Sequence, residues 1–84
     1  RRIYLTHGHV INKDHPLPFA DGDILLHGHT HVPVCEDCGT FRYLNPGSVS
    51  IPKENSPHSY MVFESGVFSW KNIETGEVYR TFAL

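Results

Sequence analysis

The sequence has no long hydrophobic run and little positive charge, and each shortage excludes a class of protein. No apolar stretch approaches the roughly 20 residues of a bilayer-spanning helix, and no signal peptide is visible, so we expect a cytoplasmic protein. Seven Lys and Arg residues against nine Asp and Glu residues give a net charge of −2. This balance argues against a basic nucleic-acid-binding surface and against a polybasic membrane signal.

Cysteine is also scarce. Cys35 and Cys38 form a lone C-x-x-C, whereas a structural zinc site needs four ligands, usually from two such pairs or from Cys and His together. The intervening Glu36-Asp37 and the following Gly39 are typical of a hairpin tip. We therefore interpret both cysteines as turn residues. A short-range disulfide and adventitious metal binding are the alternatives, and neither cysteine indicates an oxidising compartment.

The length allows one small domain at most. A chain of 84 residues buries only about 60–65% of the surface that its unfolded form exposes, so its core is marginal. The hydrophobic content of 39% fits a globular protein rather than a disordered one. The chain opens on Arg1 and its single methionine is Met61, so we interpret it as an internal piece of a longer protein.

The hydrophobic pattern predicts six or seven strands and no helix. Short apolar or alternating runs occupy residues 3–5, 23–26, 32–35, 40–44, 60–63, 68–71 and 78–84. Pro16 and Pro18 exclude a regular helix from the loop at 12–22, because proline lacks the N–H donor and restricts the residue before it. Asn45-Pro46-Gly47-Ser48 indicates a type II turn.

Histidine is what the sequence has in excess, and it gathers at the ends of two predicted strands. Thr6-His7-Gly8-His9 follows the first strand and His27-Gly28-His29-Thr30-His31 follows the second. Imidazole is the commonest protein ligand for transition metals. In an extended chain His29 and His31 would point to the same side and reach one metal or two neighbouring metals.

The position of these histidines suggests one shared site. If the two strands are parallel neighbours, their carboxyl ends would bring up to five imidazoles to one edge of the sheet. The alternative is that each histidine is an ordinary solvated or core residue. His15 and His58 lie in polar or proline-rich loops, and we interpret both as surface residues.

Three motifs, in this order, resemble one protein family. Leu5-Thr6-His7-Gly8-His9, then Gly28-His29-Thr30-His31-Val32-Pro33, then the segment 45–52 are similar to the C-terminal half of a calcineurin-like metallophosphoesterase, within it to the small bacterial (YfcE-like) phosphodiesterases. The resemblance implies an α/β fold, α+β by the content of this piece. Residues 1–84 would be the C-terminal part of a single domain, a four-layer α/β/β/α sandwich, mostly β in this chain and without its N-terminal half.

The resemblance also implies an activity and a site. The family hydrolyses phosphate esters with a hydroxide that bridges two divalent metal ions, expected here to be Mn²⁺, with Ni²⁺, Fe²⁺ or Zn²⁺ as alternatives. His7 and His29 would bind one metal and His31 the other. His9 is the catalytic candidate, beside the ligands or facing the substrate phosphate. His27 would be peripheral. The implied partners are a small phosphate ester and the missing N-terminal half.

The departures from the family are as informative as the resemblance. Its D-x-H, G-D and G-N-x-D motifs, which include the bridging aspartate, do not occur here. We therefore expect little or no phosphodiesterase activity from the isolated chain, and exposed strand edges that pair with the missing half or with a second copy.

Two alternatives stay open: a non-catalytic interaction scaffold of the same fold, and a cupin-like mononuclear metal protein using His29, His31 and Glu36. Residues 45–48 would form a loop at the rim of the site.

Overall fold

The computed structural model describes residues 2–12, 14 and 17–84, and its strands form two sheets. The seven strands are β1 (Ile3–Thr6), β2 (Asp23–His27), β3 (Pro33–Asp37), β4 (Phe41–Pro46), β5 (Ser59–Glu64), β6 (Val67–Asn72) and β7 (Val78–Ala83). Within the described residues there is no helix, and so none long and apolar enough to cross a membrane. The loop positions predicted for His15 and Pro16 lie outside the described residues.

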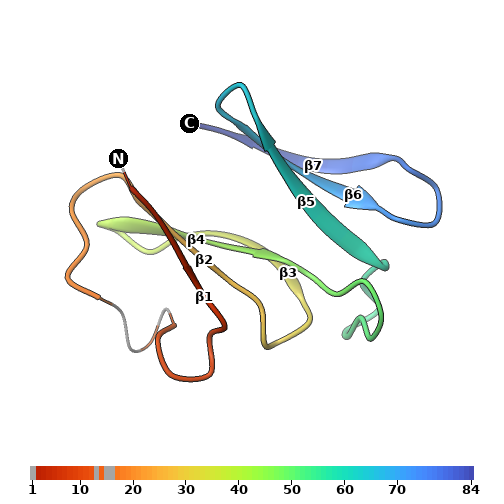
Figure 1. The fold of residues 1–84 in the computed structure, drawn as a ribbon, viewed down its shortest axis with the longest axis horizontal. Coiled ribbons are helices and arrows are strands. Elements are labelled where there is room, and N and C mark those ends of the chain that lie inside the picture. The colour runs from red at the N-terminus through yellow and green to blue at the C-terminus, as the bar shows by residue number, and fades with distance from the viewer. Residues whose placement is uncertain (1, 13, 15–16) are drawn as a thin grey trace.

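The first sheet determines where the polar loops lie. Its strand order is β1-β2-β4-β3, with β1, β2 and β4 parallel and β3 antiparallel to β4. The parallel pairing of β1 with β2, which the histidine argument required, is therefore confirmed. The loops that follow β1, β2 and β4 lie together at the lower edge of Figure 1, while both ends of the chain lie at the opposite edge.

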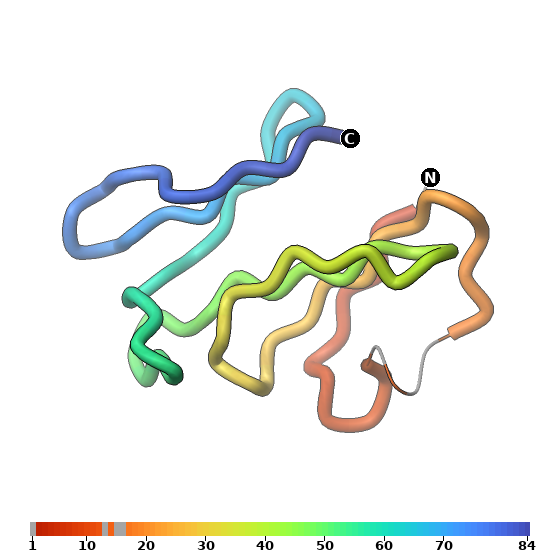
Figure 2. Tube along the Cα trace, turned by 180° about the vertical axis from the view of Figure 1, so that it is seen from behind, coloured from red at the N-terminus to blue at the C-terminus, as the bar shows by residue number. Residues whose placement is uncertain are grey.

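The second sheet packs across one face of the first (Figures 1 and 2). It is an antiparallel meander in the order β5-β6-β7. Between the sheets, Ile24 and Leu44 from the first meet Phe68 and Trp70 from the second. The opposite face of the first sheet carries a separate cluster of Leu25, Phe41 and Tyr43, against which Tyr4 and Phe19 pack. Successive side chains on a strand point to opposite faces, which gives each face its own apolar set.

The two cysteines lie on opposite faces of the first sheet. Cys35 is inside β3 and packs against the cluster between the sheets, whereas Cys38 follows β3 and packs against the Leu25 cluster. The turn prediction is thus wrong for Cys35, because strand β3 continues to Asp37. Both side chains are thiols, and a short-range disulfide does not fit this arrangement, since its two sulfurs must meet on one side of the strand.

Candidate metal centre

Three imidazoles meet at the edge where the parallel strands end. The ring centroids of His7 and His29 are 5.1 Å apart, those of His7 and His9 are 4.9 Å apart, and those of His9 and His29 are 6.4 Å apart. All three side chains are exposed to solvent. The pairing of β1 with β2 puts Thr6 opposite His27, so each histidine tag starts at the same level of the sheet. Two segments separated in sequence therefore build one cluster.

The backbone around His29 and His31 differs from the extended chain predicted for it. Strand β2 ends at His27, and φ is +69° at His29 and +63° at His31. The Thr30 N–H donates to the Gly28 carbonyl at 2.8 Å, which closes a three-residue turn centred on His29. A γ-turn with positive φ is rare and strained for a residue with a side chain. The alternation argument for a shared direction of these two rings is therefore wrong.

His27 lies beneath the cluster rather than in it. Its side chain is 4% exposed and stacks on the Tyr43 ring, with centroids 4.2 Å apart. Its Nδ1 donates to the Gly28 carbonyl at 3.0 Å. Gly8, at φ +104°, passes so close above this ring that a Cβ at position 8 would overlap Nδ1. His27 thus supports the loop that connects His7 to His9.

The hydrogen bond of His31 fixes which of its ring nitrogens remains for a cation. The His31 Nδ1 donates to the Ile51 carbonyl at 3.0 Å. Because a carbonyl only accepts, the neutral ring carries its proton on Nδ1 and its lone pair on Nε2, an arrangement common in metal-binding histidines. The Nδ1 atoms of His7 and His9 are 3.0 Å apart and share one hydrogen. Among the described residues, His31 makes no ring contact with His7, His9 or His29.

The loop after β4 is fastened to this edge of the sheet. The Lys53 N–H donates to the His31 carbonyl at 3.2 Å, and His58 Nδ1 donates to the Val49 carbonyl at 2.7 Å. His58 is half-buried, so the prediction of a surface histidine is only partly right. Its ring closes the loop on itself and holds the segment that accepts the His31 hydrogen bond.

Asn45 has a larger part in the site than the sequence suggested. We predicted a rim loop at 45–48, but Asn45 belongs to β4 and its side chain is fully buried. Its Nδ2 lies 3.0 Å from the Gly28 carbonyl, 3.1 Å from Thr30 Oγ1 and 2.9 Å from the Tyr43 hydroxyl. Its Oδ1 accepts the Gly47 N–H at 2.9 Å. A buried amide is costly unless hydrogen-bonded. The sequence carried no signal for this role, because the burial and the partners of Asn45 arise only when β2 and β4 pair.

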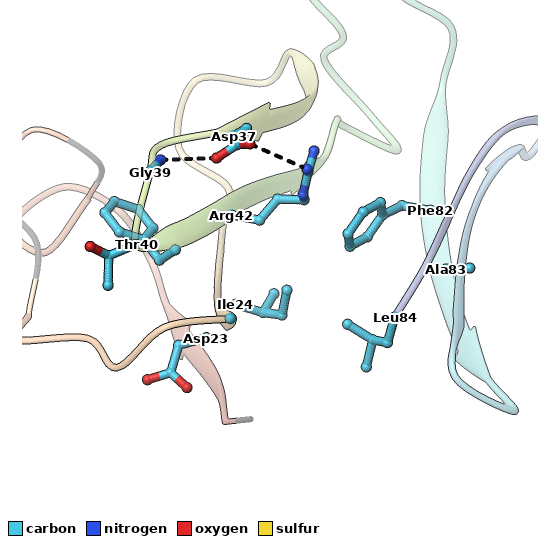
Figure 3. A pocket seen from close by; sticks show the side chains of 11 residues that line it. Asp23, Ile24, Asp37, Gly39, Thr40, Arg42, Phe82, Ala83 and Leu84 are labelled. Atoms are coloured by element: carbon cyan, nitrogen blue, oxygen red, sulfur yellow. Dashed lines mark hydrogen bonds and ion pairs between the residues drawn. The ribbon is translucent and has the colours of Figure 1, made fainter.

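One cavity beside the first sheet is remote from the histidines. It has a volume of about 340 Å³ and opens between the sheets at the end where β2 and β4 begin. Figure 3 shows Arg42 of β4 directed at Phe82 of β7, and the guanidinium carbon lies 4.3 Å from the ring centroid. Arg42 also pairs with Asp37 at 3.8 Å. A second cavity, of about 280 Å³, lies at the histidine edge and is lined by His27, His29 and Thr30.

The residues present fit only part of a metal site. Imidazoles from two strands converge, and His31 presents a lone pair, which suits Mn²⁺, Ni²⁺, Fe²⁺ or Zn²⁺. Asp14 and Glu54 line the cavity beside His29. Yet within residues 2–12, 14 and 17–84 no group of three or more His, Cys, Asp or Glu side chains is placed to hold a metal ion. The ligand set is therefore incomplete in this part of the chain.

Comparison with known proteins agrees with the histidine motifs. Residues 1–66 match the Calcineurin-like phosphoesterase superfamily domain. Phosphodiesterase YfcE of Escherichia coli strain K12 is 44% identical over 69 residues, which are 82% of this chain and 38% of that protein. A probable metallophosphoesterase of Methanocaldococcus jannaschii is 48% identical over 31 residues, 37% of this chain and 16% of that protein.

A solved structure extends the agreement to the fold. The structure of YfcE, described as a phosphoesterase from E. coli, superposes with a TM-score of 0.91 at 36% identity, over 99% of this chain and 46% of that one. The chain belongs to the calcineurin-like phosphoesterase superfamily. Within the superfamily it is a homologue of the YfcE phosphodiesterases, and it spans less than half the length of those relatives, 38% of the sequence and 46% of the solved chain.

The family assignment decides several predictions. The resemblance and the fold class, a mostly β portion of the calcineurin-like sandwich, are confirmed. The cupin-like alternative is wrong, because the chain matches a different fold over 99% of its length. Glu36, which that alternative needed as a ligand, lies in β3 opposite Tyr43 of β4.

Proposed function

We propose that this chain is the C-terminal half of a metal-dependent phosphodiesterase domain that hydrolyses phosphate esters of small molecules. The observation that carries the proposal is the meeting of His7, His9 and His29 where parallel strands end, in a chain of the calcineurin-like phosphoesterase superfamily. The printed names of its relatives, phosphodiesterase and probable metallophosphoesterase, support the same activity. A cytoplasmic location stays a prediction.

His7, His29 and His31 are the proposed metal ligands. His7 and His29 would hold one divalent cation, since their rings meet edge to face in the loops that follow β1 and β2. His31 would offer Nε2 to a second cation while Nδ1 stays bonded to Ile51. When bound, the two cations, which we expect to be Mn²⁺, lower the pKa of a water molecule and stabilise the negative charge that develops on the phosphate.

His9 is the proposed catalytic residue. Its ring is exposed and lies next to both His7 and His29, so a phosphate bound at the cluster would contact it. Its Nδ1 shares a hydrogen with His7 Nδ1. When His7 donates that hydrogen, the His7 lone pair is on Nε2, and His9 can donate its own Nε2 hydrogen to a phosphate oxygen. One side chain would thereby orient a ligand and bind the substrate.

The missing N-terminal half is the proposed partner of this chain. Strand β1 is an edge of the first sheet, and its Ile3 and Leu5 side chains are 39% and 76% exposed. An edge strand with exposed apolar side chains pairs readily with another strand. We propose that the N-terminal half covers this edge and supplies the bridging carboxylate and the remaining ligands.

The isolated 84-residue chain tests the proposal. We expect paramagnetic Mn²⁺ to broaden the imidazole NMR signals of His7, His29 and His31 more strongly than those of His58, whose Nδ1 bonds to Val49 and which is outside the proposed ligand set. We also expect no hydrolysis of bis(p-nitrophenyl) phosphate above a Mn²⁺ blank, because the ligand set is incomplete.

Two results would contradict the proposal. Equal broadening of all described histidines would remove the metal role of the cluster. Turnover comparable to that of a full-length relative would show that these residues suffice, against the predicted inactivity. In the full-length protein, intact folding and metal binding without turnover would favour the non-catalytic scaffold.

A further inference from the structure

The strained turn at His29 is held from both sides. Its centre has φ +69°, and only one backbone bond, from Thr30 N–H to Gly28 O, closes it. Strained backbone persists only where its surroundings over-determine it. In this structure the Asn45 amide contacts Gly28 O and Thr30 Oγ1, the residues immediately before and after His29.

Asn45 is well suited to hold the turn at His29 because its own position is fixed. Its side chain has no exposed surface, and its Oδ1 is occupied by the Gly47 N–H. Its backbone carbonyl accepts the indole N–H of Trp70 at 2.7 Å, and Trp70 is itself fully buried. Trp70 lies on β6, in the second sheet and beyond the 1–66 family match. The second sheet thus fixes the strand end from which the amide reaches the turn.

We propose that Asn45 is a positioning residue that holds His29 in its metal-binding conformation, with Trp70 anchoring Asn45 from the second sheet. The proposal rests on the proposed function, since the position of His29 matters for activity only if His29 binds metal. It extends that function by assigning a role to a side chain that touches neither metal nor substrate. Groups that orient a metal ligand typically change metal affinity by about 10- to 100-fold when they are mutated.

Asn45→Asp is the sharpest variant. Aspartate has the shape of asparagine and keeps the acceptor for Gly47, but its carboxylate cannot donate to Gly28 or Thr30. Thr30→Val is the second variant. Thr30 is exposed, so the loss of its hydroxyl does not threaten folding, while Thr30→Ser keeps the hydroxyl and should restore wild-type behaviour. Tyr43→Phe is the matched control, because it removes a third contact of the same amide, one that goes to neither neighbour of His29.

Two readouts in the isolated chain separate positioning from general stability. The first is hydrogen exchange at the Thr30 amide, which we expect to be about tenfold faster in Asn45→Asp and Thr30→Val as the turn opens. The second is the Mn²⁺ concentration that broadens the His29 ring signal, which we expect to rise about tenfold or more. Thr30→Ser and Tyr43→Phe should match wild type in both, with Trp70 fluorescence reporting folding in every variant.

The outcomes distinguish this inference from the proposed function. Unchanged exchange and unchanged Mn²⁺ response in Thr30→Val overturn the positioning role, even if Asn45→Asp fails to fold. Equal effects of Tyr43→Phe and Asn45→Asp also overturn it, since they would show a merely structural network. A third outcome is possible, in which the wild-type His29 ring does not respond to Mn²⁺ while hydrogen exchange at the Thr30 amide still depends on Asn45. The proposed function and the metal part of this inference would then both fail. Only the role of Asn45 in holding the turn at His29 would remain.

Discussion

The backbone of Gly8 packs so closely against the His27 ring that no side-chain atom fits at position 8. The sequence did not single out position 8. The structure shows why glycine stands there, because the buried His27 ring lies where a Cβ at position 8 would be. The glycine of the first H-G-H motif therefore has a packing cause, whereas a Cβ at Gly28, in the second motif, would meet nothing within 4 Å.

Gly8→Ala should destabilise the fold more than a glycine replacement elsewhere. The positive φ costs about 1–2 kcal/mol for any residue with a Cβ, and the overlap with His27 adds an overpacking penalty of about 1–3 kcal/mol. Gly76→Ala is the matched control, with φ +77° and open space around its Cβ position. Urea unfolding followed by Trp70 fluorescence measures both. Equal losses in the two variants would show that His27 moves aside freely.

At the scale of elements, the start of β2 is secured by one carboxylate. The 2% exposed Asp23 accepts the Ala20 N–H and the Arg2 N–H, each at 2.9 Å. The bond from Ala20 is the largest cause of a lowered pKa for Asp23, which its burial opposes and the bond from Arg2 reinforces. Asp23 thus ties the strand that carries the histidines to the loop before it and to β1.

Acid should weaken this link. Because the pKa of Asp23 is lower in the folded chain, its stabilising effect is complete above the ordinary Asp pKa of about 3.9 and is lost as the pH falls through the lower folded value. We expect Asp23→Asn to be less stable than wild type at pH 6 and to lose less stability between pH 5 and pH 2. Urea unfolding across that range tests this. The exposed Asp21→Asn is the control, and parallel curves for wild type and Asp23→Asn would contradict the prediction.

The strands were predictable, and so was the hairpin turn at Gly39, but the conformation of the loop at His29 was not. Strands such as β2 and β5 follow local apolar runs, so their positions agreed with the sequence within a residue or two. The conformation of His29 depends on Asn45, which is 16 positions away in the chain and adjacent only after β2 and β4 pair. A local pattern carries no such information. For the same reason the extended geometry predicted for His29 and His31 failed, although the meeting of His7 with His29 was predicted.

At the scale of the whole molecule, the exposed edge at β1 should make the isolated chain associate with itself. Leu5 is 76% exposed on that strand. We expect the 9.6 kDa chain to elute in size-exclusion chromatography with light scattering as a larger species whose mass rises with concentration.

A charge on the edge strand should reverse this association. Leu5→Lys places a cation where a second strand would pair, a device by which natural edge strands avoid aggregation. Ile73→Lys is the control, because Ile73 is 50% exposed in the turn after β6 and lies on no strand. A wild-type chain that stays monomeric at every concentration would exclude the association. Equal masses for the two variants would show that the association does not involve β1.

The strand order also means that the two sheets lose different amounts of chain entropy when they form. The second sheet is built from neighbours joined by short turns, so closing each of its pairs fixes few residues. The first sheet joins Ile3 to Ile24 and Ile24 to Arg42, and each pairing must close a loop of about twenty residues before any contact rewards it. The histidine cluster exists only after those long loops have closed. A strand that the proposed N-terminal half adds beside β1 would also have to close a long loop. The histidine cluster would then be among the last features of the domain to form and among the first to be lost when the domain opens locally.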